Sequence, residues 1–203
     1  MALSADEFRS RVLAACQRII DSSERLCEAD RDLGDGDHGL TMARAFAAAR
    51  DALLAAPPSP GGDLAMLGAK LMGAGGTAGI VFGTWFSTAG RAIGSKELDA
   101  PLLAKAMTEA AEAVRTRSKA SAGDKTMVDA LLPAVEALRG AANEGIEAAL
   151  DKAAVSAARG AEATRDMVAR VGKAKTMGER AKGFVDPGAL SVTIIFEGLA
   201  AKP

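Results

Sequence analysis

Apolar residues recur at steps of three and four along nearly all of this 203-residue chain, a spacing that buries them best as one face of an α-helix. The first such stripe runs from Phe8 to Cys27. Just before it, Ser4 and Glu7 fit a capping box that begins a helix. Further stripes follow at 42–54, 64–72, 103–114, 128–138 and 157–171. We therefore predict an all-α protein of seven or eight antiparallel helices.

Two places along the chain allow more than one interpretation. Val192 to Phe196 is a run rich in β-branched residues, which are favoured in strands. With no second run to pair with, a buried C-terminal helix is the better interpretation. Pro133 lies inside an apolar stripe, so it should either kink its helix or belong to the first turn. The sequence leaves both possibilities for Pro133 open.

The composition suggests how such helices could pack. Alanine is abundant, and aromatic residues make up only 3% of the chain. Small side chains let helices approach closely, and alanine has the highest helix propensity. Close helices with few bulky residues can ring a central axis, as a barrel or bundle whose open end offers a pocket. The length permits one core and no Pro/Ser-rich linker divides the chain, so we expect one domain over residues 1–203.

Charge and cysteine content argue against several classes of protein. The net charge is −1 and the charged residues are scattered, which disfavours a nucleic-acid partner. Cys16 and Cys27 fall within one predicted helix, about 16 Å apart, which is too far for a disulfide. They fit core thiols of a cytosolic protein. The acidic start, and the lack of an apolar run of about 18 residues, disfavour export and membrane insertion, so we expect a cytoplasmic location.

Four carboxylates and the only histidine are concentrated among three glycines between residues 30 and 39. Carboxylates this close repel one another unless a hard cation with oxygen ligands lies between them. Asp30, Asp35 and Asp37 could converge on one or two metal ions, because the glycines let the backbone turn sharply. Mg2+ is the natural candidate, and it is normally shared with substrate phosphates. The alternative is a solvated acidic turn.

Other features of this loop narrow the possibilities. An EF-hand counted from Asp30 fails, because Asp35 stands at its glycine position and Thr41 at its last ligand position. Asp32 is expected to face solvent. A single histidine is too few for the usual zinc sites, so His38 is either a hydrogen-bonded structural residue or a contact to phosphate or hydroxyl.

A glycine-rich stretch at 73–79 is followed by Gly83-Thr84-Trp85. Glycine amides beside a helix N-terminus can form a nest for phosphate, but the same glycines also permit tight helix packing. Residues 73–78 match G-x-G-x-x-A, yet a helical stripe precedes them instead of a strand, which removes the context of a dinucleotide site. No Walker A lysine follows. Phosphate contact and packing both stay open.

Two more segments could contact a nucleotide. Asp124 is a credible N-cap for the helix that follows it, and Met127 could line an adenine pocket because a thioether packs well on flat rings. Near the C-terminus, Asp186-Pro187-Gly188 is first of all a turn before the last helix. The lysines that precede this turn suit phosphate and solvent equally well.

Taken in order, these segments resemble the nucleotide-binding L subunit of dihydroxyacetone kinases. The motifs are Gly-Asp-Gly-Asp-His-Gly from residue 34, Gly-Gly-Thr-Ala-Gly from residue 75, Gly-Asp-Lys-Thr-Met from residue 123 and Asp-Pro-Gly-Ala from residue 186. Each is weak alone, but the four in this order across nearly the whole chain are specific. The resemblance implies an eight-helix antiparallel barrel with an adenine nucleotide, ADP or ATP, at one end. It also implies two Mg2+ ions between the phosphates and three aspartates.

The resemblance assigns roles to individual residues. Asp30, Asp35 and Asp37 would be the metal ligands. The implied nucleotide contacts are His38, Gly39, Leu40 and Thr41 at the loop-to-helix turn, Thr77 and Ala78 in the glycine-rich loop, Ser118, Met127, Lys173, and Asp186, Pro187 and Gly188 in the last turn. Ser118 and Lys173 stand where the family usually has glycine and arginine, so Lys173 would supply charge without a bidentate fork.

In that family a separate K subunit holds the sugar, and the L subunit presents the phosphoryl group to it. The resemblance therefore implies a phosphotransferase subunit that carries half of an active site. Either ADP stays bound and is rephosphorylated by a phosphohistidine-carrying protein of the phosphotransferase system, or ATP exchanges and serves a dihydroxyacetone or erythrulose kinase. We favour the first version, because the chain stands alone and carries His38. A nucleotide-loaded regulatory protein that binds a transcription regulator is the alternative from another class, and a homodimer is expected.

Overall fold

The computed structural model describes residues 2–202. This part of the chain contains nine α-helices, three short 3₁₀ helices and no β-strand, which confirms the all-α prediction. The strand-like run at 192–196 is helical, as predicted. None of the helices described here is both long and apolar enough to span a bilayer. The α-helices are α1 (Ala5–Asp21), α2 (Ser23–Arg31), α3 (His38–Leu54), α4 (Pro60–Ala74), α5 (Gly76–Ile93), α6 (Ala100–Ser118), α7 (Val128–Gly140), α8 (Ile146–Ala163) and α9 (Pro187–Ala200). The 3₁₀ helices are η1 (Ala142–Glu144), η2 (Thr164–Asp166) and η3 (Lys173–Ala181).

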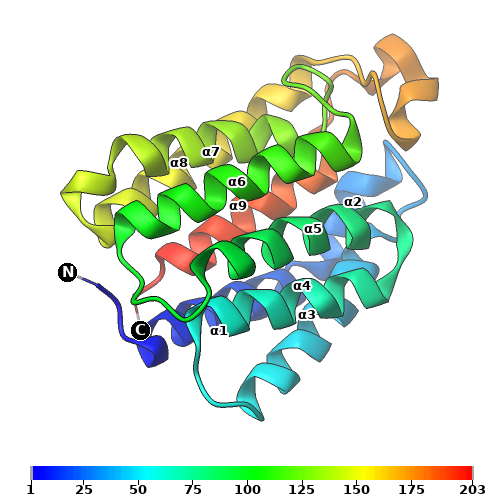
Figure 1. Cartoon of the computed structure of the whole chain (residues 1–203). Coiled ribbons are helices and arrows are strands. Elements are labelled where there is room, and N and C mark those ends of the chain that lie inside the picture. Colours follow the sequence, from blue (N-terminus) through cyan, green and yellow to red (C-terminus); the bar gives the residue numbers. More distant parts are fainter. Residues whose placement is uncertain (1, 203) are drawn as a thin grey trace.

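Eight of the helices described between residues 2 and 202 form a closed ring (Figure 1). Following the chain from α1 to α3 and on to α9, each helix packs against the next, and α9 packs against α1. Neighbouring helices run in opposite directions. The remaining helix, α2, packs on α3 and α9 beside the ring. This is the eight-helix antiparallel arrangement that the sequence predicts.

Six of the seven aromatic residues lie in the core of this ring, and Phe184 is exposed. Trp85 of α5 stacks on Phe86, with ring centroids 4.7 Å apart, and its ring centroid is 5.7 Å from that of Phe196 in α9. All three side chains are buried. Where α9 meets α1, a Cβ on Gly198 would lie 2.3 Å from the Cα of Ala15. The ring therefore closes at this contact because a residue without a side chain lets the two helices approach.

The N-terminal apolar stripe is divided between two helices. The capping box is confirmed, since the Ser4 hydroxyl accepts a hydrogen bond from the Glu7 amide at 3.2 Å. The prediction of a single helix containing both Cys16 and Cys27 is wrong, because Ser22 separates α1 from α2 with a ψ of 8°. The second helix resumes after this one residue, so the apolar spacing continues across the break and hides it. Both cysteines are buried thiols.

The stripe at 157–171 is helical only in its first half. α8 ends at Ala163, and Met167 is extended with a ψ of 151°, so the prediction of a helix over the whole stripe is wrong. The spacing was misleading because Val171, beyond the helix, still packs against the core. Apolar spacing records which residues face the core, and a non-helical segment can satisfy it over a short distance.

The start of α7 also differs from the prediction. Asp124 is not the N-cap of this helix, since its carboxylate accepts a hydrogen bond from the Ser121 amide at 2.7 Å, within the preceding turn. Asp129, in the first turn of α7, accepts instead from the Thr126 amide at 2.8 Å. A carboxylate inside the helix thus bonds the amides that precede it. Pro133 lies in the interior of α7, which decides against a place in the first turn.

Two arginines cover the helix C-termini at one end of the ring. Arg9 donates to the carbonyl oxygens of Leu53 at 2.6 Å and Pro57 at 2.9 Å, and it forms a buried ion pair with Asp63. Arg11 donates in the same way to the last carbonyls of α9. The final carbonyls of a helix have no partners within the helix, so these guanidinium groups satisfy them.

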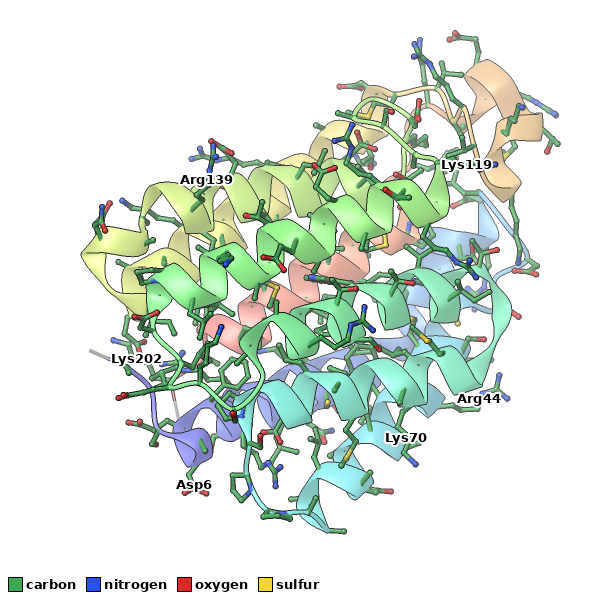
Figure 2. All side chains as sticks on the ribbon, in the orientation of Figure 1. Asp6, Arg44, Lys70, Lys119, Arg139 and Lys202 are labelled. Carbon is green, nitrogen blue, oxygen red and sulfur yellow. The ribbon has the colours of Figure 1, made fainter. Side chains whose placement is uncertain are left out.

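The opposite end of the ring carries the starts of α3, α5, α7 and α9 (Figure 1). Helix starts present unpaired amides and the positive end of the helix dipole. The acidic loop before α3, the α4–α5 turn, the α6–α7 connection and the segment before α9 all lie at this end. Figure 2 places Lys119 here, and Asp6 and Lys202 at the other end. The segments that carry the four sequence motifs therefore lie at the same end of the ring.

Candidate functional site

Three aspartates converge between α2 and α3. Asp30, in the last turn of α2, is 7% exposed, and Asp35 and Asp37 follow in the exposed loop. One carboxylate oxygen from each lies within 4.8 Å of those of the other two. The loop glycines allow this, because a Cβ on Gly34 would lie 2.3 Å from an Asp30 carboxylate oxygen and Gly36 has a φ of +75°. The structure brings together the three side chains that the sequence predicts as metal ligands.

A lysine from a distant segment partly neutralises this cluster. Lys173 Nζ lies 2.5 Å from Asp35 Oδ2. This hydrogen bond holds the pKa of Asp35 below its usual range and raises that of Lys173. Three carboxylates against one ammonium leave the site negative, and a set of oxygen donors suits a hard divalent cation such as Mg2+. The residues present therefore fit a metal of this kind, whereas Asp32 points to solvent as predicted.

His38, the first residue of α3, holds this helix against α9. Its Nε2 lies 2.8 Å from the Ser191 hydroxyl, which itself donates to the carbonyl of Pro187 at 3.0 Å. The serine proton is thus in use, so we assign the hydrogen to His38 Nε2. Burial lowers the pKa of His38 to about 4, although the charge of Asp30 opposes the shift. The ring is neutral near pH 7, and its Nδ1 is left as an acceptor.

The next residues of α3 have different surroundings. A Cβ on Gly39 would lie 1.9 Å from the carbonyl oxygen of Ser23, so glycine is needed for α2 and α3 to approach this closely. Leu40 is 59% exposed, and Thr41 is half-buried with its amide bonded to the Asp37 carbonyl at 3.0 Å. The first turn of α3 therefore packs on α2 through Gly39, whereas Leu40 on the same turn is exposed to solvent.

The glycine-rich stretch has the geometry for both roles left open by the sequence, through different residues. Gly75 and Gly76, at the α4–α5 turn, have φ values of +74° and +68°, and a Cβ on either would meet open space. A Cβ on Gly79 would lie 2.5 Å from the Leu71 carbonyl oxygen, so that glycine allows α5 to pack on α4. The exposed Thr77 follows in the first turn of α5. Backbone amides at an open helix start can bind an anion such as phosphate.

The turn before α9 lies against the start of α7. A Cβ on Gly188 would be 3.3 Å from the Cβ of Met127, so the predicted adenine contact and the predicted closing turn are neighbours. Asp186 is the N-cap of α9, and its Oδ2 accepts a hydrogen bond from the Ala189 amide at 2.8 Å. Pro187 is the first helical residue and is buried. The turn predicted from the sequence is confirmed.

The remaining predicted residues lie at the same end of the ring but on other helices. Ala78 is half-buried in the first turn of α5. Ser118 is the last residue of α6, and its hydroxyl donates to the Val114 carbonyl at 2.8 Å and accepts from the Ala120 amide at 3.2 Å. The acidic loop, the α5 start and the α6 end thus all lie at this end of the ring.

Several residues that shape this region were not identified from the motifs. Ser191 and Thr164 are buried hydroxyls that bond across elements, to His38 and to the Asp186 amide. Leu33 belongs to a small apolar cluster apart from the main core. A lone apolar residue in an acidic loop is a signal that could have identified Leu33, whereas the two hydroxyls look like ordinary helix residues in the sequence.

Asp186→Asn is expected to change the pH dependence of stability. Burial raises the pKa of Asp186 to about 7, despite the Ala189 amide and the charge of Lys125, which lower it. The charge of Asp129 adds to the increase. An unfolded aspartate titrates near pH 4, so the folded state binds this proton more tightly. The free energy of unfolding should therefore fall as pH rises from about 4 to about 7, by at most about 1.4 kcal/mol per pH unit.

The measurement is urea unfolding in EDTA at several pH values, for wild type and Asp186→Asn. His38 acts in the opposite direction, since its pKa of about 4 in the folded state lies below that of an unfolded histidine. The informative quantity is thus the difference between the two proteins, which should favour the asparagine variant increasingly as pH rises. Parallel curves over this range would contradict the prediction.

Comparisons with known proteins agree with this geometry. A family model described as the DAK2 domain matches residues 32–201. The ADP-binding subunit of the PEP-dependent dihydroxyacetone kinase of Escherichia coli (strain K12) is 39% identical over 194 residues, covering 93% of this chain and 92% of that protein. The ADP-binding subunit of PEP-dependent dihydroxyacetone kinase 1 of Listeria innocua serovar 6a is 33% identical, covering 90% and 89%. The D-erythrulose kinase of Mycolicibacterium smegmatis is 34% identical, but the match covers 89% of this chain and 32% of that one.

The fold is also similar to a solved structure. It matches the dihydroxyacetone kinase of C. freundii in complex with AMP-PNP and Mg2+, with a TM-score of 0.74 and 25% sequence identity. The match covers 98% of this chain and 34% of that one, so this chain spans about a third of that kinase. The resemblance read from the motifs is confirmed by the family model, the relatives and the fold. This chain belongs to the DAK2 domain family and is of the L-subunit type of dihydroxyacetone kinases.

Proposed function

We propose that this chain binds an adenine nucleotide with Mg2+ and presents its terminal phosphoryl group to a sugar held on a second subunit. The observation that carries the proposal is the convergence of Asp30, Asp35 and Asp37 at the end of the ring where four described helices begin. Carboxylates would hold the cation, and helix starts would favour the phosphates. The two ADP-binding subunits that match nearly end to end support ADP as the nucleotide.

The residues predicted from the motifs would bind different parts of the Mg2+ and nucleotide complex. The three aspartates would hold two Mg2+ ions against the phosphates. Met127 would pack on the adenine, and the turn from Asp186 to Gly188 would close the site beside it. The other contacts would come from His38, Gly39, Leu40, Thr41, Thr77, Ala78, Ser118, Lys173 and Pro187.

The contribution of this chain to the reaction would be positioning. Bound Mg2+ would supply neutralisation of the charge on the phosphoryl group. The amides at the starts of α3 and α5 would orient the phosphates, and Lys173 would add positive charge beside Asp35. Phosphoryl transfer requires little covalent chemistry from the protein, so a general base on this chain is not needed. The sugar would lie on a separate K-type subunit.

We further propose that ADP stays bound as a cofactor and is rephosphorylated by a phosphohistidine-carrying protein of a PEP-dependent phosphotransferase system. Two relatives that this chain matches over 92% and 89% of their length are described as ADP-binding subunits of PEP-dependent dihydroxyacetone kinases, which supports this version. The alternative is an exchangeable ATP, with dihydroxyacetone or erythrulose as the acceptor. A homodimer and a contact with a transcription regulator stay predictions of the resemblance.

Gel filtration tests the proposal. Protein loaded with ADP and Mg2+ is expected to elute with a near-equimolar amount of ADP, measured by mass spectrometry of the denatured fraction. EDTA in the buffer should release the nucleotide, because the phosphates would lose the ion that joins them to the aspartates. Rapid loss of ADP in Mg2+, together with sugar phosphorylation by ATP and the K-type subunit alone, would favour the exchangeable version. Absence of any Mg2+-dependent binding of ADP or ATP would reject the proposal.

A further inference from the structure

Lys125 is a buried lysine to which the proposed site gives no role. It is 1% exposed, and its backbone has a φ of +60°, which is uncommon for a residue other than glycine. Burial lowers its pKa, and the nearby charge of Asp186 opposes this shift most strongly. Burying an ammonium group costs free energy unless it is well hydrogen-bonded. The hydrogen-bond partners of Lys125 therefore indicate which part of the structure it stabilises.

The ammonium joins two places that are far apart in the sequence. Lys125 Nζ donates to the carbonyl oxygen of Thr164 at 2.6 Å and to that of Phe184 at 2.5 Å. These two residues directly flank the segment between them, which we call the 165–183 loop. Lys125 thus holds both ends of this loop from the turn before α7.

The ends of the 165–183 loop are also bonded to each other. The Gly183 amide donates to the carbonyl oxygen of Arg165 at 2.8 Å, and the Arg165 guanidinium donates to the Gly183 carbonyl at 2.6 Å. These two hydrogen bonds hold the two ends of the loop together. We call these joined ends, Arg165 and Gly183 with the flanking Thr164 and Phe184, the neck of the loop. Arg165 is exposed and bonds the neck on its outer side, whereas the buried Lys125 bonds it on its inner side.

Beyond its neck, the 165–183 loop reaches the acidic loop at two points. Lys173 pairs with Asp35. Leu33, from the acidic loop, shares a small apolar cluster with three alanines of the 165–183 loop, which are Ala169, Ala174 and Ala181. This cluster is separate from the main core of the ring. Val171 of the loop also packs against the main core, and the Arg170 amide donates to the Asp124 carbonyl at 3.2 Å. The place of the loop beside the aspartates therefore depends on these few contacts and on the neck.

A hydrogen bond also connects the neck to the turn before α9. The Asp186 amide donates to the Thr164 hydroxyl at 2.9 Å, and Asp186 caps α9. The turn that Asp186 begins lies against Met127, two residues after Lys125. One buried ammonium thus lies between the loop that carries Lys173 and the turn beside the predicted adenine contact.

We propose that Lys125 is a positioning residue, which fixes the neck of the 165–183 loop and so holds Lys173 over the acidic loop. The proposal rests on the nucleotide site proposed above, and Lys125 acts through the loop instead of by contact with the ligand. Without the ammonium, two carbonyls would lose a charged donor. The loop could then open while the ring stays folded, because its apolar contacts are few.

The test is hydrogen exchange combined with ADP binding in Lys125→Met, which keeps the length of the apolar stem. Lys175→Met is the matched control, because it removes the same charge from an exposed position within the loop. In Lys125→Met, amides of the 165–183 loop are expected to exchange about tenfold faster or more, while those of α1 and α4 keep their rates. The dissociation constant of ADP in Mg2+ should rise about tenfold or more. Lys175→Met should resemble wild type in both measurements.

Three results would overturn the proposal. If exchange rose equally in the loop and in the ring helices, Lys125 would be a general stabilising residue. If the loop exchanged faster but ADP bound as in wild type, the loop would not position the site. Should Lys125→Met fail to fold, Lys125→Gln, which keeps an N–H donor, is judged by the same two criteria. An unchanged exchange rate in the loop would by itself reject a role of Lys125 at the neck. Failure of the proposed function is recognised separately, because wild type would then not bind ADP.

Discussion

Asp35→Ala is expected to weaken Mg2+-dependent binding of ADP by about 100-fold or more, and to abolish its retention in gel filtration. The expected size follows from the loss of one of the three carboxylates that would face the cation. Asp35 is the informative position among the three aspartates. Asp30 is buried and also accepts a hydrogen bond from the His38 amide at 3.2 Å, so its replacement could disturb the fold.

Asp32→Ala is the matched control for this prediction. It removes one carboxylate from the same loop, but Asp32 is exposed and lies outside the cluster of three. Asp35→Ala also loses the pair with Lys173, which is exposed and therefore contributes little to stability. Without Mg2+, both variants should unfold at nearly the urea concentration of wild type. Binding of ADP by Asp35→Ala that equals binding by Asp32→Ala would refute the metal site.

Arg9→Met is expected to lower the free energy of unfolding by about 3–5 kcal/mol. Asp63 is 1% exposed, and without Arg9 its charge would be buried with no opposite charge against it. The carbonyls of Leu53 and Pro57, which receive hydrogen bonds from the guanidinium, would also lose a charged donor. Urea unfolding followed by circular dichroism gives the difference directly.

Two comparisons make this second prediction specific. Arg18→Met removes an exposed pair with Glu197, whose charged atoms are 3.8 Å apart, and it should cost less than about 1 kcal/mol. Replacing Asp63 by leucine in the Arg9→Met protein should recover part of the loss, since it removes the unpaired buried charge. Because Arg9 lies at the end of the ring away from the site, ADP affinity of the folded variant should stay near that of wild type. An Arg9→Met protein as stable as Arg18→Met would show that the buried pair contributes nothing.

Apolar spacing predicted most helices because it reports which residues face a core. It could not place the break at Ser22, where one residue leaves the helix and the spacing continues. It also extended the stripe that begins in α8 into Val171, which packs against the core from outside a helix. In both places the error concerned the path of the backbone, whereas the side of the chain that faces the core was predicted well.

The candidate site was predictable to a similar extent. Asp30, Asp35 and Asp37 stood out because close carboxylates and glycines within one short segment restrict the chemistry on their own. Lys125 did not stand out, since the two carbonyls that it binds are 39 and 59 residues away. The hydroxyl partner of His38, on Ser191, is 153 residues away. No local pattern marks a hydrogen bond across such distances.

The sequence by itself determined that this chain is helical and that one short loop concentrates its negative charge. Both properties depend on residues close together along the chain, so spacing and composition are enough to reveal them. The tertiary structure alone decided which helix starts meet, that the 165–183 loop reaches the aspartates, and that a buried ammonium fastens its neck. These features depend on the packing of eight helices into a ring, closed where Gly198 meets Ala15, and such packing unites residues that no local pattern connects.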